Sequence, residues 1–145
     1  MSSPTPSGRA ESSMSDLDHA AYLLAMASRD IAALRGMRDD LSTFDDSIFG
    51  FHAQQAVEKC LKAWIAGLGG RYERTHDLAD LVRVLTSLGA DLAGVDPHPE
   101  LTPFGVLFRH EEPDAGAEPM DRGGLIDDVD ALAERAKLAI RAPGP

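Results

Sequence analysis

The sequence predicts an all-α protein, an antiparallel bundle of four to five helices. Apolar residues recur at steps of three and four over long segments, which is the period of one buried helix face. No segment shows sustained alternation of apolar and polar residues, so no sheet is expected. Clusters of glycine and proline separate the periodic segments, as loops between helices do.

The size and composition fit one soluble domain. The chain has 145 residues, of which 43% are hydrophobic and 26% charged. We expect a disordered tail over residues 1–14, a helical domain over 15–141 and a flexible tail over 142–145. No run of about eighteen apolar residues predicts a membrane span, and the Ser/Pro-rich start does not read as a secretory signal. The single cysteine excludes an intramolecular disulfide, so a reducing cytoplasm is the expected location.

The first predicted helix begins with Ser15 as its N-cap. Asp16 and Asp18 follow in the first turn, where carboxylates suit the helix dipole. Its apolar face comprises Leu17, Ala20, Ala21, Leu24, Ala27, Ile31 and Leu34. Gly36 marks the expected end.

The second predicted helix begins near Asp45 or Asp46 and carries a wide apolar stripe up to Leu68. The width of the stripe predicts that this helix is the most buried one. Glu58 and Lys62 lie four residues apart with the acid first, which favours an ion pair. The residues assigned to its polar side are Gln54, Gln55, Glu58, Lys59 and Lys62.

Three further elements complete the prediction. Thr75 is expected to cap a third helix that ends near Leu88. Thr102 and Pro103 predict the N-cap and first position of a short fourth helix with Phe104, Leu107 and Phe108. A loop rich in proline, glycine and acid over 111–124 then leads to a last helix from about Leu125 to Arg141.

Two sequence blocks are more specific than periodicity. Residues 54–63 read QQAVEKCLKA, and THDL follows at 75–78. Both blocks and their order resemble the HEPN domain family, a family of helical domains. The resemblance covers roughly residues 15–141 and makes the bundle HEPN-like. It gives a structural or interface role to five residues of these blocks, Gln55, Glu58, Lys62, Thr75 and Asp77.

The resemblance implies a homodimer, often encoded beside a minimal nucleotidyltransferase in a toxin–antitoxin or related pair. Several branches of the family are metal-independent ribonucleases. Those carry an arginine followed four to six residues later by a histidine, late in the chain. The histidine can take the proton of a ribose 2′-hydroxyl, and the arginine can hold the phosphate.

The residues around Arg109, where the nuclease branches carry their late arginine and histidine, depart from the nuclease pattern. Arg109 is followed directly by His110, and no histidine comes later. The sequence looks more like a branch with Arg-Tyr-Pro at this point, with His110 in the place of the tyrosine. Arg109 and His110 are the first candidates for a catalytic pair. Arg71 and His76 match the spacing literally but lie in a turn, where His76 can instead bond the backbone or a carboxylate.

Other chemistries have little support in the sequence. His52 and Glu58 are six residues apart and do not share a helix face, so they do not form a metal set with His76, and no metal or cofactor is expected. Cys60 reads as a buried, inert thiol and Trp64 as part of the core or a dimer interface. The net charge of −10 opposes extensive phosphate binding.

Three functions therefore stay open. The first is a dimeric interaction or regulatory module without nuclease activity. The second is a metal-independent endoribonuclease toxin, in which RNA would be the substrate. The third is a nucleotide-binding accessory domain, although no glycine-rich phosphate loop is present.

Overall fold

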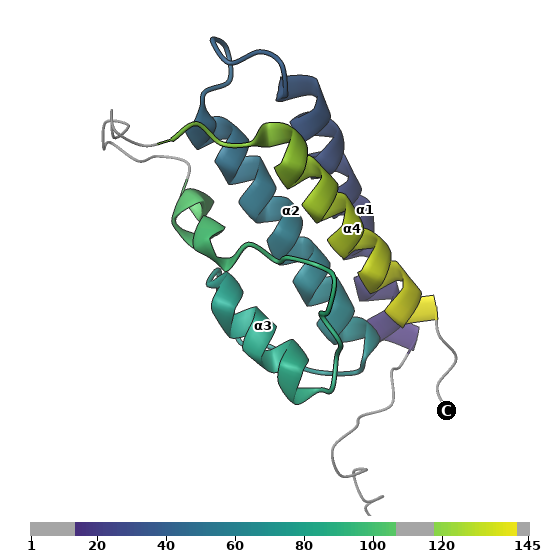
Figure 1. Cartoon of the computed structure of the whole chain (residues 1–145). Coiled ribbons are helices and arrows are strands. Elements are labelled where there is room, and N and C mark those ends of the chain that lie inside the picture. Colours follow the sequence, from purple (N-terminus) through teal and green to yellow (C-terminus); the bar gives the residue numbers. More distant parts are fainter. Residues whose placement is uncertain (1–13, 107–117, 142–145) are drawn as a thin grey trace, which may run out of the picture.

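The computed structural model describes residues 14–106 and 118–141, and all regular secondary structure in these ranges is helical (Figure 1). The predicted all-helical class is confirmed. The elements are α1 (Met14–Met37), α2 (Asp46–Gly67), α3 (Leu78–Ser87), the 3₁₀ helix η1 (Pro99–Gly105) and α4 (Arg122–Arg141). Within the described part of the chain, no helix has the length and apolar character that crossing a membrane requires.

Helix α2 is the centre of the bundle. It contacts α1 and α4 on one side and α3 and η1 on the other (Figure 1). α1 runs antiparallel to α2 and α4, while α2 and α4 run in the same direction because α3 and η1 intervene in the chain. The candidate functional site lies where α2 meets α3 and η1.

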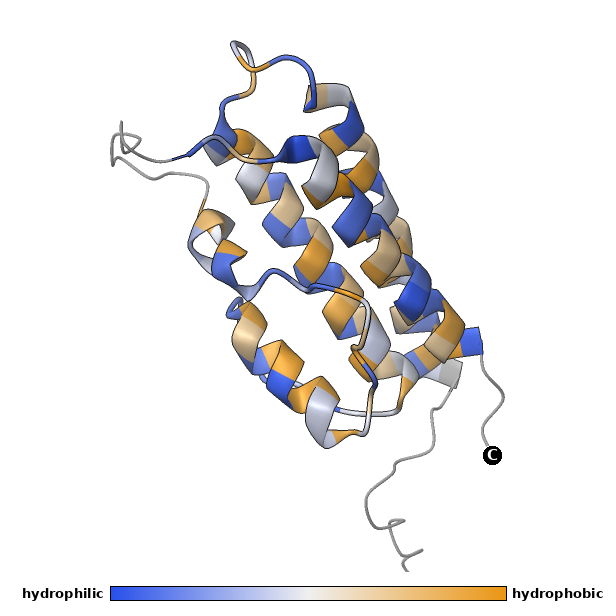
Figure 2. Ribbon diagram, in the orientation of Figure 1, coloured by the Kyte–Doolittle hydropathy of each residue, from blue (hydrophilic) through white to orange (hydrophobic). Residues whose placement is uncertain are grey.

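The burial of α2 follows from its wide apolar stripe. Asp45 caps the helix, because its Oδ1 accepts a hydrogen bond from the backbone N–H of Ile48 at 3.1 Å. Phe49, Leu61 and Cys60 are fully buried. The predicted burial of Cys60 is confirmed, and burial raises the pKa of its thiol to about 12. Figure 2 shows hydrophobic and hydrophilic residues interleaved along each long helix.

The end of α2 turns the chain back along its own surface. Gly69 has a φ of 75°, a left-handed conformation that glycine adopts without strain. The backbone N–H of Gly70 donates to the carbonyl of Ile65 at 2.9 Å, which closes the helix end. Residues 70–77 therefore run beside α2 before α3 begins.

The 3₁₀ helix η1 packs closely on the first half of α2. A Cβ added to Gly50 would overlap the ring of Phe104, so the absence of a side chain on α2 allows this approach. A Cβ on Gly105 would lie 3.0 Å from the Gln54 side chain. η1 thus covers the face of α2 that holds Gln54.

The predicted N-caps of α1 and α3 are wrong. α1 begins at Met14, so Ser15 lies inside its first turn. α3 begins at Leu78, and its cap is Asp77, whose Oδ1 accepts from the N–H of Ala79 at 3.0 Å. Thr75 instead accepts from the N–H of Asp77 at 3.0 Å, which shapes the turn before the cap.

The last two elements also begin earlier than predicted. Thr102 and Pro103 lie within η1, whose first residue is Pro99. Leu107 and Phe108, expected in this helix, lie outside the described residues. α4 begins at Arg122 rather than near Leu125, so the end of the predicted loop is helical.

Arg122 explains the early start of α4. Its side chain is 5% exposed and lies over the Phe49 ring at 4.8 Å. It donates to the carbonyls of Met37 at 2.9 Å and Phe44 at 2.5 Å, and pairs with Asp46 at 3.1 Å. These bonds tie the start of α4 to the α1–α2 connection.

Candidate functional site

A row of polar side chains runs along one face of α2. Gln54, Glu58 and Lys62 follow one another at four-residue steps, so they share that face. The prediction that they lie on the polar side is wrong for Gln54 and Glu58, which are buried. The turn before α3 and helix η1 cover them, and periodicity within α2 could not show this.

Glu58 is the centre of the row. Its carboxylate accepts hydrogen bonds from Gln54 Nε2 at 3.0 Å, Lys62 Nζ at 3.0 Å and His76 Nδ1 at 2.9 Å. Burial raises the pKa of Glu58, but these hydrogen bonds outweigh burial and hold the pKa below its ordinary value. Glu58 is therefore an ionised carboxylate with partners for its charge, and the predicted Glu58–Lys62 pair is confirmed.

The row continues to α1 through an aromatic ring. Lys62 Nζ lies 5.4 Å from the centre of the Tyr72 ring, and the Tyr72 hydroxyl lies 3.0 Å from His19 Nε2. Burial and the charge of Glu58 raise the pKa of Tyr72, so its hydroxyl stays protonated. We call these connected side chains the Glu58 network: Gln54, Gln55, Glu58, Lys62, Tyr72, His76 and His19.

His76 is the exposed end of the network. Its side chain is 73% exposed, whereas that of Glu58 is 8% exposed. Since an ionised carboxylate only accepts, Nδ1 carries the hydrogen, and Nε2 is left for solvent or a ligand. A carboxylate that orients an exposed histidine in this way also prepares it for proton transfer. The same contact anchors the turn before α3.

Arg71 is held by different partners. Its guanidinium pairs with Asp16 of α1 at 3.4 Å and donates to the Gly70 carbonyl at 3.0 Å. His76 pairs with Glu58 of α2. The two residues of the literal Arg–His match are thus oriented toward different helices.

The remaining residues of the two blocks make local contacts. Gln55 Nε2 donates to Gln54 Oε1 at 2.8 Å, which extends the Glu58 network toward the surface. Thr75 Oγ1 donates to Asp80 at 3.3 Å. Together with the cap at Asp77, the Thr75 contact shapes the connection between α2 and α3.

The model of the HEPN domain family matches residues 20–102 of the chain, which is more than half of its length. The chain belongs to the HEPN domain family. Comparisons with curated proteins and with solved structures give no match.

The match covers both blocks of the Glu58 network but ends before the late motif. Gln54 to Ala63 and Thr75 to Leu78 lie inside the matched region. Arg109 and His110, the first candidates for a catalytic pair, lie outside the match and outside the described residues. A catalytic role for them stays a prediction.

A second group of ionisable side chains lies in this HEPN domain between the α3–η1 loop and α4. His98 Nδ1 lies 2.7 Å from Glu100 Oε1, and His98 Nε2 lies 2.7 Å from Asp128 Oδ2 and 3.6 Å from Asp96 Oδ2. Burial lowers the pKa of His98, but the hydrogen bonds to Asp128 and Glu100 outweigh it and raise the pKa. The sequence alone does not indicate this group, because Asp128 lies thirty positions after His98.

The structure does not bring His52 together with Glu58 and His76. His52 pairs with Asp30 at 3.3 Å, whereas His76 pairs with Glu58. Among the described residues, the group with metal-ligand geometry is Asp96, His98 and Asp128.

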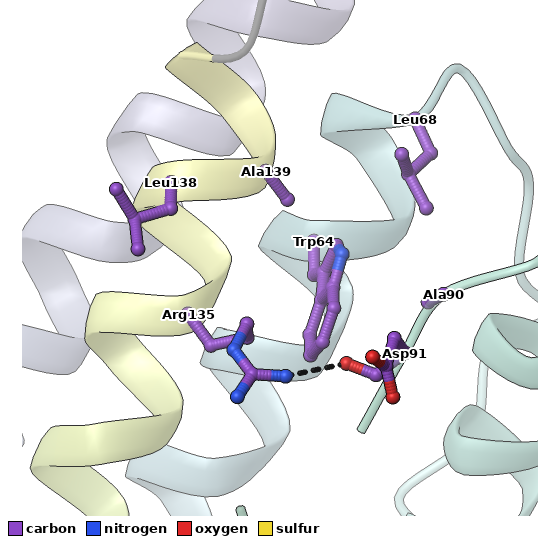
Figure 3. A pocket seen from close by; sticks show the side chains of 7 residues that line it. All are labelled: Trp64, Leu68, Ala90, Asp91, Arg135, Leu138 and Ala139. Carbon is purple, nitrogen blue, oxygen red and sulfur yellow. Dashed lines mark hydrogen bonds between the residues drawn. The ribbon is translucent and has the colours of Figure 1, made fainter. Parts of the chain in front are cut away.

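An open pocket of about 460 Å³ lies between α2, α4 and the start of the α3–η1 loop (Figure 3). Trp64 forms one wall but is only 2% exposed, so it belongs to the core of this chain. The core was one of the two roles that the sequence predicted for it, beside a dimer interface. Arg135 donates to the carbonyls of Asp91 at 2.6 Å and Ala93 at 2.8 Å. Arg135 thus holds the start of the α3–η1 loop against α4.

Proposed function

We propose that this HEPN domain is a dimeric interaction or regulatory module without nuclease activity, in a nucleotidyltransferase-linked or toxin–antitoxin-like system. The observation that carries the proposal is the set of three hydrogen bonds that Glu58 accepts. This buried carboxylate binds Gln54, Lys62 and His76 at once and so ties the turn before α3 to α2. The histidine of the literal Arg–His match therefore has a structural task.

The late part of the sequence supports the same proposal. No histidine follows His110, so Arg109 lacks the partner that nuclease branches of the family carry. The net charge of −10 also disfavours a long contact with RNA phosphates. A regulatory protein that binds another protein needs neither a histidine partner for Arg109 nor a surface that attracts RNA phosphates.

The dimer is tested by mass. Light scattering on the purified chain at micromolar concentration is expected to give about twice the 15.5 kDa mass of one chain. A single-chain mass over the whole concentration range would overturn the dimeric part of the proposal.

A second candidate is a metal-independent ribonuclease that uses His76. It is favoured by the exposed imidazole whose Nδ1 is oriented by the buried Glu58. In this reading His76 Nε2 takes the proton of a 2′-hydroxyl, and Arg71 binds the phosphate after leaving Asp16. Cleavage of RNA that is lost in His76→Ala would favour this candidate over the first.

A further inference from the structure

We propose that Asp96, His98 and Asp128 form a binding site for one divalent transition-metal ion that joins the α3–η1 loop to α4. Asp96 and His98 lie in the α3–η1 loop and Asp128 lies in α4, and the three donor atoms lie within 4.8 Å of one another. An ion with bonds of about 2.1 Å separates neighbouring ligands by about 3.0–3.4 Å, so small side-chain movements suffice.

Glu100 supports the assignment because of where it binds the imidazole. Its Oε1 lies 2.7 Å from His98 Nδ1, the ring nitrogen opposite the proposed ion. Metal-bound histidines commonly donate their second N–H to a carboxylate, which fixes the tautomer and aims the other nitrogen at the metal. With Nδ1–H donated to Glu100, the lone pair of Nε2 points toward Asp96 and Asp128. A proton on Nε2 would leave to solvent when the ion binds.

The charge of the group also favours a cation. Among the described residues, the ion pairs of Asp96, Glu100 and Asp128 all go to His98. Three carboxylates thus face one imidazole, so negative charge remains even when the ring is protonated. A divalent ion would compensate this charge more fully than one proton does.

The backbone places His98 for this role. His98 has a φ of 47°, a left-handed conformation that is costly for a residue with a Cβ. Its N–H donates to Asp96 Oδ1 at 2.9 Å, and Pro97 and Pro99 flank it. The side chain is 18% exposed, while Asp128 is 45% exposed, so the site is open to solvent on its carboxylate side.

The location gives the ion a structural effect. η1 and α3 pack on α2, and α4 packs on α1 and α2, so the α3–η1 loop reaches α4 through side chains. One such tie is Arg135 to the Asp91 and Ala93 carbonyls, and His98 to Asp128 is another. A bound ion would strengthen the second tie and raise the melting temperature.

The test uses the full chain, free of any histidine tag and treated with EDTA. Zn²⁺, Mn²⁺ and, for comparison, Mg²⁺ are titrated by calorimetry after the EDTA is removed, and melting temperatures are recorded with and without each ion. We expect one ion per chain and a higher melting temperature. Asp128→Asn should weaken binding at least ~10-fold, and Asp127→Asn, the same change at the exposed neighbouring position, should leave it within about twofold.

Three outcomes would overturn the proposal. The first is the absence of saturable binding to the wild type. The second is an affinity that falls equally in Asp127→Asn and Asp128→Asn, since this would indicate diffuse attraction by acidic residues. The third is binding of Mg²⁺ as tight as that of Zn²⁺, because a site with an imidazole ligand prefers the transition metal. Circular dichroism of each variant confirms that it is folded.

Discussion

His76 Nδ1 lies 2.9 Å from Glu58 Oε1, so a turn that precedes α3 is held against the middle of α2. The imidazole is exposed and the carboxylate is buried. Lys62 and Gln54 bind the same carboxylate, which makes this contact part of a connected polar group rather than an isolated surface pair. The stability of the α2–α3 connection therefore depends on the charge of Glu58.

Glu58→Gln should lower the free energy of unfolding by about 1–3 kcal/mol at pH 7. The amide has the size of the carboxylate, but its NH₂ group meets donors from Gln54 or Lys62. Urea unfolding measures the loss. Glu134→Gln is the matched control, because Glu134 is an exposed residue of α4 that pairs with Lys137, and it should cost less than ~0.5 kcal/mol. Equal losses in the two variants would contradict the role of the Glu58 network.

The contribution of Glu58 should depend on pH in one direction. Its pKa in the fold lies below the ordinary value of 4.5, so the stabilisation is present above pH 4.5 and is lost as pH falls through the lowered pKa. The difference in unfolding free energy between wild type and Glu58→Gln should therefore shrink below pH 4.5. Lys62, His76 and Tyr72 face the carboxylate and are present in both proteins. A difference that grows on acidification would contradict the account.

Arg122→Met should lower the free energy of unfolding by about 2–4 kcal/mol. Methionine keeps much of the contact with Phe49 but leaves the carbonyls of Met37 and Phe44 without their donor. Arg35→Met is the control, since Arg35 forms a half-exposed pair with Asp130, and it should cost about 1 kcal/mol or less. Unfolding of both variants at the same urea concentration would contradict this prediction.

Gly50→Ala and Gly36→Ala should change stability in opposite directions. Alanine favours a helix over glycine by up to about 1 kcal/mol, and a Cβ at Gly36 meets nothing within 4 Å. A Cβ at Gly50 overlaps Phe104, so this variant should instead lose about 1–2 kcal/mol. Adding Phe104→Ala should remove most of the clash cost. Stabilisation by both alanines would show that η1 does not lie against Gly50.

The sequence predicted those features that depend on short-range pattern. The apolar stripe and Asp45 predicted α2 almost to its bounds, and the blocks at 54–63 and 75–78 predicted the family. The Glu58–Lys62 pair followed from a four-residue spacing, which is a property of one helix. These predictions needed no knowledge of how the elements pack.

The errors arise where a distant segment decides the environment. Gln54 looked exposed because nothing within α2 indicates that η1 covers it. Arg122 stands in a segment rich in glycine and acid, and its burial depends on carbonyls more than seventy residues earlier. His98 had a local signal, an Asp-Pro-His-Pro-Glu stretch, but Asp128 comes from α4 and could be added only by the fold.

We propose that this HEPN domain does not cut RNA. The direct measurement incubates the purified chain with total RNA in EDTA, beside Arg109→Ala, His110→Ala, Arg71→Ala and His76→Ala variants. We expect the wild type to leave the RNA as intact as all four variants do. Cleavage by the wild type that any one of these substitutions abolishes would contradict it, and the substitution responsible would locate the active site.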